Sequence, residues 1–216
     1  MRVLDIETID ADGAIRETQE EAMTRSTAVR RAAAFGGAFL GGGALLGMLA
    51  PGAKAAGLAK SDLAILNYAL TLEYLESAFY AEALAANALT GELKVFATVV
   101  GAHEAAHVVG LKDVLGKKAV KSPKFDFQGT TADAAKFAAT AQVLEDTGVA
   151  AYTGQAPLVK SNVVLVSALS IHAVEARHAG WIRAINGAAP APAAFDQPMT
   201  MKQVLAAVAK TKFIES

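Results

Sequence analysis

The chain carries two copies of one pattern of polar residues, each made of a glutamate and, 30 or 31 positions later, a Glu-x-x-His motif. The first copy consists of Glu73, Glu104 and His107, and the second consists of Glu145, Glu175 and His178. In both copies a tyrosine, Tyr80 or Tyr152, follows the first glutamate by seven positions. Two similar halves in one helical bundle place equivalent residues around a common axis, so the six glutamate and histidine side chains can converge.

The composition favours helices over strands. Hydrophobic residues make up 53% of the chain and aromatic residues only 6%, and the chain is rich in alanine, which has the highest helix propensity. Few stretches alternate in the way that strands require. The net charge of −1 gives no indication of a nucleic-acid partner. Because there is no cysteine, disulfides, thiolate zinc sites and thiol nucleophiles are excluded.

Capping residues, helix-ending glycines and apolar periodicity predict five helices. Their expected ranges are 61–89, 92–115, 131–154, 161–186 and 199–213. Ser61 is expected to be the N-cap of the first helix and Asp62 an acidic residue in its first turn. Gly116 and Gly187 are expected to end the second and the fourth helix. Only a few residues join the first helix to the second, and the third to the fourth. Each of these two pairs is therefore expected to form an antiparallel hairpin.

The link between the two hairpins is long enough to follow the whole length of a bundle. It covers about 14 residues, from 117 to 130, which span at most ~46 Å when extended. A helix of about 25 residues is ~37 Å long. The expected fold is therefore all-α, a four-helix bundle with one long crossover plus a short C-terminal helix. We divide the chain into a leader (1–56), the bundle (57–187), and a linker with the C-terminal helix (188–216).

The six repeated glutamates and histidines are expected on apolar helix faces. Val100 and Leu111 lie on the same helix face as the first Glu-x-x-His motif, one on each side of it. Ile171 and Ile182 lie in the same way on either side of the second motif. Burying four carboxylates without cations would be very costly. Carboxylates that bridge two ions, with one imidazole for each ion, suit hard or borderline metals. This is the ligand set of di-iron and di-manganese helix bundles, so we predict that the six side chains hold two iron or manganese ions.

Two features beside these ligands allow more than one interpretation. Glu76 lies one turn from Glu73 and competes with it as a ligand, but its repeat partner is Gly148. We therefore choose Glu73 and expect Glu76 at the rim of the site. Tyr80 and Tyr152 are either ordinary half-buried aromatics or donors that orient a carboxylate on the facing helix.

His103 completes a His-Glu-x-x-His motif that ends at His107, a pattern typical of zinc metallopeptidases in which the glutamate is the base. That interpretation leaves Glu175, His178 and the tyrosine repeat unexplained, and the sequence contains no candidate for a substrate-binding strand. We expect His103 and His172 to be polar neighbours of a paired metal site.

The first 56 residues have the features of an export signal. Residues 32–50 contain no charge and six glycines, and they follow the pair Arg30 and Arg31. Ala53-Lys54-Ala55 resembles a small-x-small cleavage site. The twin arginines favour the Tat route, with the Tat translocase as a partner, although Val29 stands where serine or threonine is usual. An uncleaved membrane anchor is the alternative interpretation.

The residues before this signal are unusually acidic. Seven acidic side chains lie between Asp5 and Glu21, whereas export signals begin with a basic segment. We therefore infer that Met23 is the true translation start.

Four stretches together resemble the ferritin-like superfamily, particularly exported bacterial ferritin-like domain proteins of the desiccation-related type. These stretches are Leu70–Tyr80, His103–His107, Ala141–Gly148 and Ala173–His178. The resemblance covers about Ser61 to Asn186 and implies a ferritin-like fold with its metal site. It implies no single activity, because members variously oxidise ferrous iron, reduce peroxide, dismutate peroxide with manganese or hydroxylate substrates.

The expected function is that of an exported di-metal carboxylate protein, periplasmic, extracellular or in the cell envelope. Its metal pair would carry out redox chemistry with O2, peroxide or ferrous iron. The alternative is a non-enzymatic stress protein of the desiccation-related type, whose metal pair is structural. A zinc metallopeptidase is less favoured.

Overall fold

The computed structural model describes residues 57–215, so the predicted leader, its twin arginines and Met23 lie outside the described residues. The long helices are α4 (Lys60–Ala86), α5 (Gly91–Leu115), α6 (Ala134–Gln155) and α7 (Asn162–Ile185), followed by the shorter α8 (Met201–Thr211). Short 3-10 helices, η2 (Gly116–Lys118), η3 (Thr130–Ala132) and η4 (Ala156–Leu158), lie between them. None of the described helices is both long enough and apolar enough to span a bilayer.

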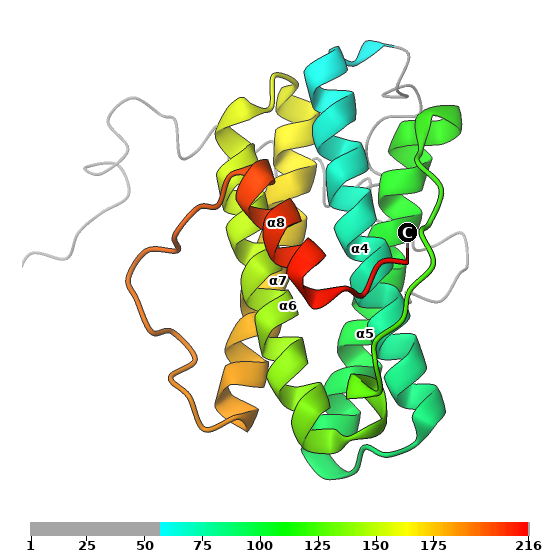
Figure 1. Cartoon of the computed structure of the whole chain (residues 1–216). Coiled ribbons are helices and arrows are strands. Elements are labelled where there is room, and N and C mark those ends of the chain that lie inside the picture. The colour runs from blue at the N-terminus through cyan, green and yellow to red at the C-terminus, as the bar shows by residue number, and fades with distance from the viewer. Residues whose placement is uncertain (1–56, 216) are drawn as a thin grey trace, which may run out of the picture. The chain divides into compact units, whose positions relative to one another are not determined.

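The four long helices form a bundle of two antiparallel hairpins (Figure 1). α4 packs along α5, and α6 packs along α7. The crossover between the hairpins runs along the bundle from the end of α5 to the start of α6 (Figure 1). Phe127 anchors it, because its buried ring packs edge-on against Phe79 of α4. The predicted all-α fold with one long crossover is confirmed.

Two predicted helix ends differ from the observed ones by three residues. α4 stops at Ala86, because Asn87 adopts a left-handed conformation (φ 52°) and caps the helix. α6 begins at Ala134 rather than at Thr131, because the Asp133 side chain accepts a hydrogen bond from the Lys136 amide as the N-cap.

The predicted N-cap of the first helix, Ser61, is wrong, whereas Asp62 lies in the first turn as predicted. α4 begins at Lys60, and its N-cap is Ala59, which provides no side-chain hydrogen bond. Asp62 is fully buried and instead accepts hydrogen bonds from the backbone amides of Lys160 and Ser161, at 3.0 and 2.9 Å. Asp62 thus ties the start of α4 to the connection between α6 and α7.

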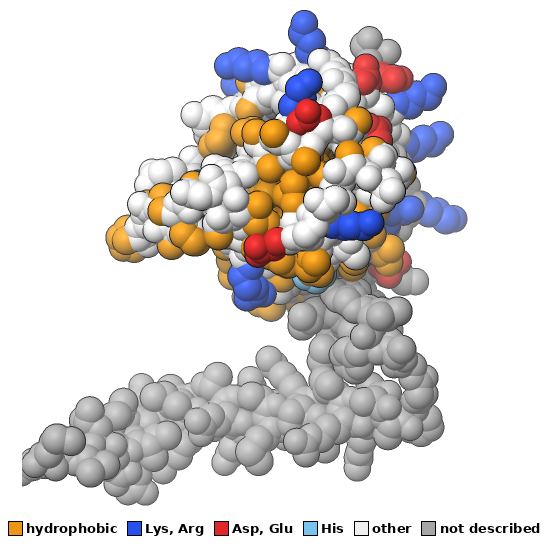
Figure 2. Space-filling view, turned by 90° about the horizontal axis from the view of Figure 1, so that it is seen from below, with side chains coloured by type: hydrophobic (Ala, Val, Ile, Leu, Met, Phe, Trp, Pro, Cys, Tyr) orange, Lys and Arg blue, Asp and Glu red, His pale blue; other side chains and the backbone are white. Residues whose placement is uncertain are grey.

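The bundle interior consists of two hydrophobic clusters with a polar layer between them. One cluster includes Phe79, Phe96 and Phe137, and the other includes Leu70 and Leu115. On each long helix the predicted metal ligands lie between members of the two clusters. Viewed from the end where α4 turns into α5, hydrophobic side chains gather near the centre and many Lys and Arg side chains lie at the edge (Figure 2). The polar layer is therefore held inside an otherwise apolar bundle.

The C-terminal segment crosses α6 at Gly154 and returns to the crossover. A Cβ atom at Gly154 would lie 1.9 Å from the Met199 carbonyl oxygen, so only glycine permits this close approach. After α8, the Asp126 amide donates to the Phe213 carbonyl at 2.9 Å, and Phe213 packs edge-on against Phe127. The C-terminal segment therefore covers both α6 and the crossover.

Candidate metal centre

The six predicted ligands meet inside the bundle, and none is more than 5% exposed. They form two groups in which the ligand atoms all lie within 4.8 Å of one another. The first group is Glu73, Glu104, His107 and Glu175, and the second is Glu104, Glu145, Glu175 and His178. Glu104 and Glu175 belong to both groups. Each group draws on three helices, α4, α5 and α7 in the first and α5, α6 and α7 in the second.

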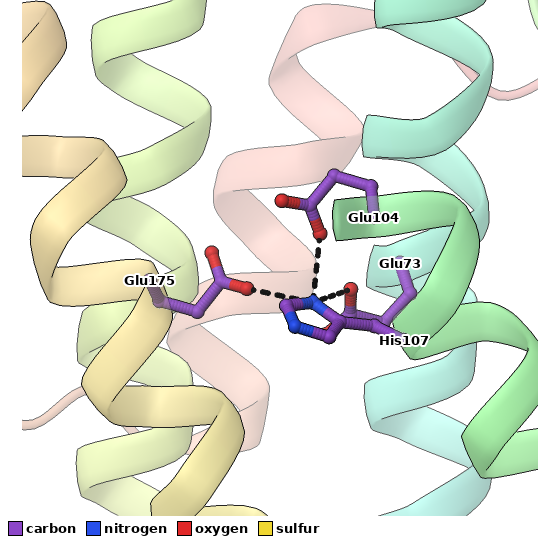
Figure 3. A group of neighbouring side chains, drawn as sticks. All are labelled: Glu73, Glu104, His107 and Glu175. Atoms are coloured by element: carbon purple, nitrogen blue, oxygen red, sulfur yellow. Dashed lines mark hydrogen bonds and ion pairs between the residues drawn. The ribbon is translucent and has the colours of Figure 1, made fainter. Parts of the chain in front are cut away.

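The spacing of the atoms suits one ion in each group. In the first group, His107 Nδ1 lies 3.2 Å from Glu73 Oε2 and 3.1 Å from both Glu104 Oε2 and Glu175 Oε1 (Figure 3). Two ligands at right angles around an ion, with bonds of about 2.1 Å, are about 3 Å apart. The observed separations therefore match neighbouring ligands of a shared ion.

The second group repeats this arrangement with the other oxygens of the shared carboxylates. His178 Nδ1 lies 3.0 Å from Glu104 Oε1, 3.3 Å from Glu145 Oε2 and 3.7 Å from Glu175 Oε2. Glu104 and Glu175 therefore direct one oxygen toward each group, which is the geometry of a carboxylate that bridges two ions.

Several of these atoms have no hydrogen bond within the described part of the chain. They are Glu104 Oε1, Glu145 Oε2, both Glu175 oxygens and His178 Nδ1, all of which are buried. Leaving a buried polar atom unsatisfied costs about 1–3 kcal/mol, and more for a charged group. Metal ions would satisfy all of them, so the residues present fit a pair of cations with oxygen and imidazole ligands.

The electrostatics of the metal-free site reflect an excess of buried carboxylates. Burial raises the pKa of Glu145 to about 7, and burial followed by neighbouring carboxylates raises the pKa of Glu104 well above its ordinary range. Burial alone would lower the pKa of His178, but the three carboxylates that pair with it, those of Glu104, Glu145 and Glu175, outweigh burial and raise that pKa to about 12. Without metal, the site therefore retains protons to balance its charge.

The two tyrosines of the repeat orient the terminal carboxylates. Tyr80 on α4 donates to Glu145 Oε1 on α6, and Tyr152 on α6 donates to Glu73 Oε1 on α4 at 2.6 Å. Both rings are buried rather than half-buried. Each hydrogen bond leaves the other oxygen, Oε2, facing a histidine. Each tyrosine thus donates to a carboxylate on the facing helix, the second of the two interpretations given above. Each hydrogen bond fixes which carboxylate oxygen is free to bind an ion.

Replacing Tyr152 with phenylalanine is expected to weaken metal binding in the first group about 10- to 100-fold, because Glu73 loses the donor that orients it. The measurement is a calorimetric titration of the metal-free protein with Mn²⁺. Tyr74→Phe is the matched control, since the Tyr74 hydroxyl contacts the Val120 carbonyl outside the metal site. Equal affinities in the two variants would show that Tyr152 does not position Glu73.

The histidines outside the repeat have different environments. His103 belongs to neither group, and its Nδ1 lies 2.8 Å from His178 Nε2. Burial, followed by the neighbouring histidines, lowers the pKa of His103. A neutral His103 could accept a hydrogen bond from the Nε2 proton of His178 if His178 bound a metal through Nδ1. His172 Nε2 lies 2.8 Å from Thr153 Oγ1. This geometry favours the paired site over a single zinc ion between His103 and His107.

The predicted position of Glu76 at the rim is wrong. Only 4% of Glu76 is exposed, because α4 buries most of its circumference and the residue one turn after Glu73 also faces the interior. Its repeat partner Gly148 lies next to it, since a Cβ atom there would be in ordinary contact with Glu76 Oε1, at 3.4 Å. The sequence feature that could have indicated a buried Glu76 is the Glu-x-x-Glu spacing of Glu73 and Glu76, because the equivalent position in the other half of the repeat is a glycine.

Comparison with protein-family models matches residues 61–188 to the ferritin-like domain. No curated protein matches the chain. The matched region covers more than half of the 216 residues and contains α5, α6, α7 and nearly all of α4, with all six ligands of the paired site. The relation to exported, desiccation-related members stays a prediction. The chain belongs to the ferritin-like domain family.

Proposed function

We propose that this protein holds a pair of iron or manganese ions and uses them in redox chemistry with O2 or peroxide. The observation that carries the proposal is the sharing of Glu104 and Glu175 between the two groups. Shared carboxylates would hold two ions close enough for both to act on one two-atom oxidant. When bound, the metal pair would supply the electrons that reduce the oxidant.

Each ligand has a defined part in this proposal. Glu104 and Glu175 would bridge the ions, while Glu73 with His107 and Glu145 with His178 would each complete one group. The tyrosine hydroxyls hold the terminal carboxylates in place. The hydrophobic clusters on both sides of the layer exclude bulk water, which strengthens electrostatic interactions inside it.

Anaerobic reconstitution tests the proposed function. Metal-free protein is loaded with Fe²⁺ or Mn²⁺, the bound metal is measured by elemental analysis, and O2 or peroxide is then added while its consumption is followed. We expect two ions per chain and oxidant consumption that depends on them. Well under one ion per chain after reconstitution would contradict the proposal. Two ions without any turnover would instead assign the pair a structural role.

A further inference from the structure

Glu76 is a fifth buried carboxylate beside the four glutamates of the paired site, and none of the interactions described above uses it. Its surroundings are acidic, because the charges that act on it most strongly are those of Glu175, Glu145, Glu104 and Glu73. Burial, followed by these charges, raises the pKa of Glu76 well above its ordinary range. A buried carboxylate among four others is costly unless a cation accompanies it.

Glu76 lies near the oxygen of Glu175 that faces the second group. The Cβ position of Gly148 on α6 is 3.4 Å from Glu76 Oε1 and 3.5 Å from Glu175 Oε2. Glu175 Oε2 is the oxygen that faces His178. The Glu76 carboxylate therefore extends from α4 toward α6 and toward the ligands of the second group.

The two halves of the repeat differ here, because Glu76 in the first half corresponds to Gly148 in the second. The site therefore has only one additional carboxylate. A glutamate at position 148 would add a sixth buried acid next to Glu76, whereas glycine adds none. Four ionised carboxylates balance the charge of two divalent ions. A fifth carboxylate is therefore available to give one ion a ligand that the other ion lacks.

We propose that Glu76 is a seventh protein ligand, which binds the ion of the second group and makes the two metal sites unequal. This proposal rests on the proposed function, since it requires that the pair of ions binds. Glu76 lies outside both groups as they stand. With it, the second group would offer four carboxylates and one imidazole, whereas the first group offers three carboxylates and one imidazole. A hard cation in the second group is then held more tightly.

Calorimetric titration of the metal-free protein with Mn²⁺ tests the proposal, with Co²⁺ absorption as a second readout of ligand number. The wild type is expected to bind two ions in two steps of unequal affinity. Glu76→Gln keeps the shape of the side chain but removes its charge, and it should weaken the tighter step about 10- to 100-fold while the other step changes little.

Two further variants separate ligation from a general effect of charge. Glu82→Gln removes a carboxylate from the same helix, where it accepts a hydrogen bond from Thr131 Oγ1, and it should leave both steps unchanged. Glu76→Asp keeps the charge but shortens the side chain. It should weaken the tighter step if Glu76 reaches the ion, and it should leave that step unchanged if only the charge matters.

The outcomes distinguish this proposal from the proposed function. Unchanged affinities and Co²⁺ spectra in Glu76→Gln, with two ions still bound by the wild type, would overturn the seventh ligand alone. A wild type that binds no metal would overturn both proposals. Circular dichroism of each variant verifies that the bundle has folded.

Discussion

Replacing Glu175 with alanine is expected to remove both metal ions from the protein. Glu175 directs Oε1 toward His107 of the first group and Oε2 toward His178 of the second. Each group would lose one of its carboxylates and the bridge that brings the two ions together. Elemental analysis after reconstitution with Fe²⁺ or Mn²⁺ should show a fall from two ions per chain to well under one.

Glu145→Ala is the control for this experiment, because Glu145 belongs only to the second group. It should remove about one ion and leave the other in place. Equal losses in both variants would contradict the sharing of Glu175 between the groups. Retention of one zinc ion by Glu175→Ala, bound through His103 and His107, would instead favour the peptidase interpretation.

Removal of the metal is expected to destabilise the protein most strongly at neutral and alkaline pH. The pKa of Glu145 in the folded, metal-free protein is raised to about 7 from an ordinary value of 4.5. The stability linked to its proton is fully present below pH 4.5 and is lost as the pH rises through 7. This one group accounts for a loss of about 3 kcal/mol.

The proton on His178 also stabilises the metal-free protein at lower pH. The raised pKa of His178, about 12, stabilises the metal-free fold below pH 6.5, and this contribution declines as the pH rises toward 12. Burial alone would raise the pKa of Glu175, but His107 and His178 lower it to about 2. The ionised Glu175 carboxylate therefore stabilises the fold above pH 4.5, and this stability is lost as the pH falls toward 2. The metal-free protein should therefore be most stable near pH 5.

Binding of two ions should reverse this instability. At concentrations 100 times above the dissociation constant, each ion contributes about 2.7 kcal/mol, which for a protein of this size corresponds to a rise in Tm of about 10–20 °C for the pair. The rise should be larger at pH 7.5 than at pH 5, because the ions must displace protons from the ligands. Thermal unfolding with and without chelator measures it.

Two results would contradict this expectation. One is an identical Tm for the loaded and the metal-free protein at pH 7.5. The other is a metal-free protein that is more stable at pH 7.5 than at pH 5, which would mean that the buried carboxylates carry no excess of protons.

Much of the fold follows from the sequence, because its determinants are local or repeated. Helix periodicity and the helix-ending glycines predict the four long helices to within three residues, and the length of the 117–130 link predicts the crossover. The repeat predicts that six side chains converge, because symmetry about a common axis requires no knowledge of individual contacts. The structure brings these six together in two groups.

The features that the sequence does not predict depend on contacts between distant segments. Asp62 binds backbone amides at Lys160 and Ser161, and no local pattern indicates that pairing. Glu76 was expected at the rim because Gly148 cannot bind a metal. The structure shows that Glu76 nevertheless faces the interior, next to Gly148 on α6.

The region that defines the family is shorter than the unit that must fold. The family match ends at residue 188, but the Phe127 ring in the crossover is covered by Phe213, and Phe125 pairs with Ile214 in an antiparallel bridge. A chain truncated at the family boundary would expose the Phe127 ring, whose burial is worth about 1.5–3 kcal/mol. The packed structure therefore extends at least to Ile214, past the matched segment that contains the candidate metal ligands.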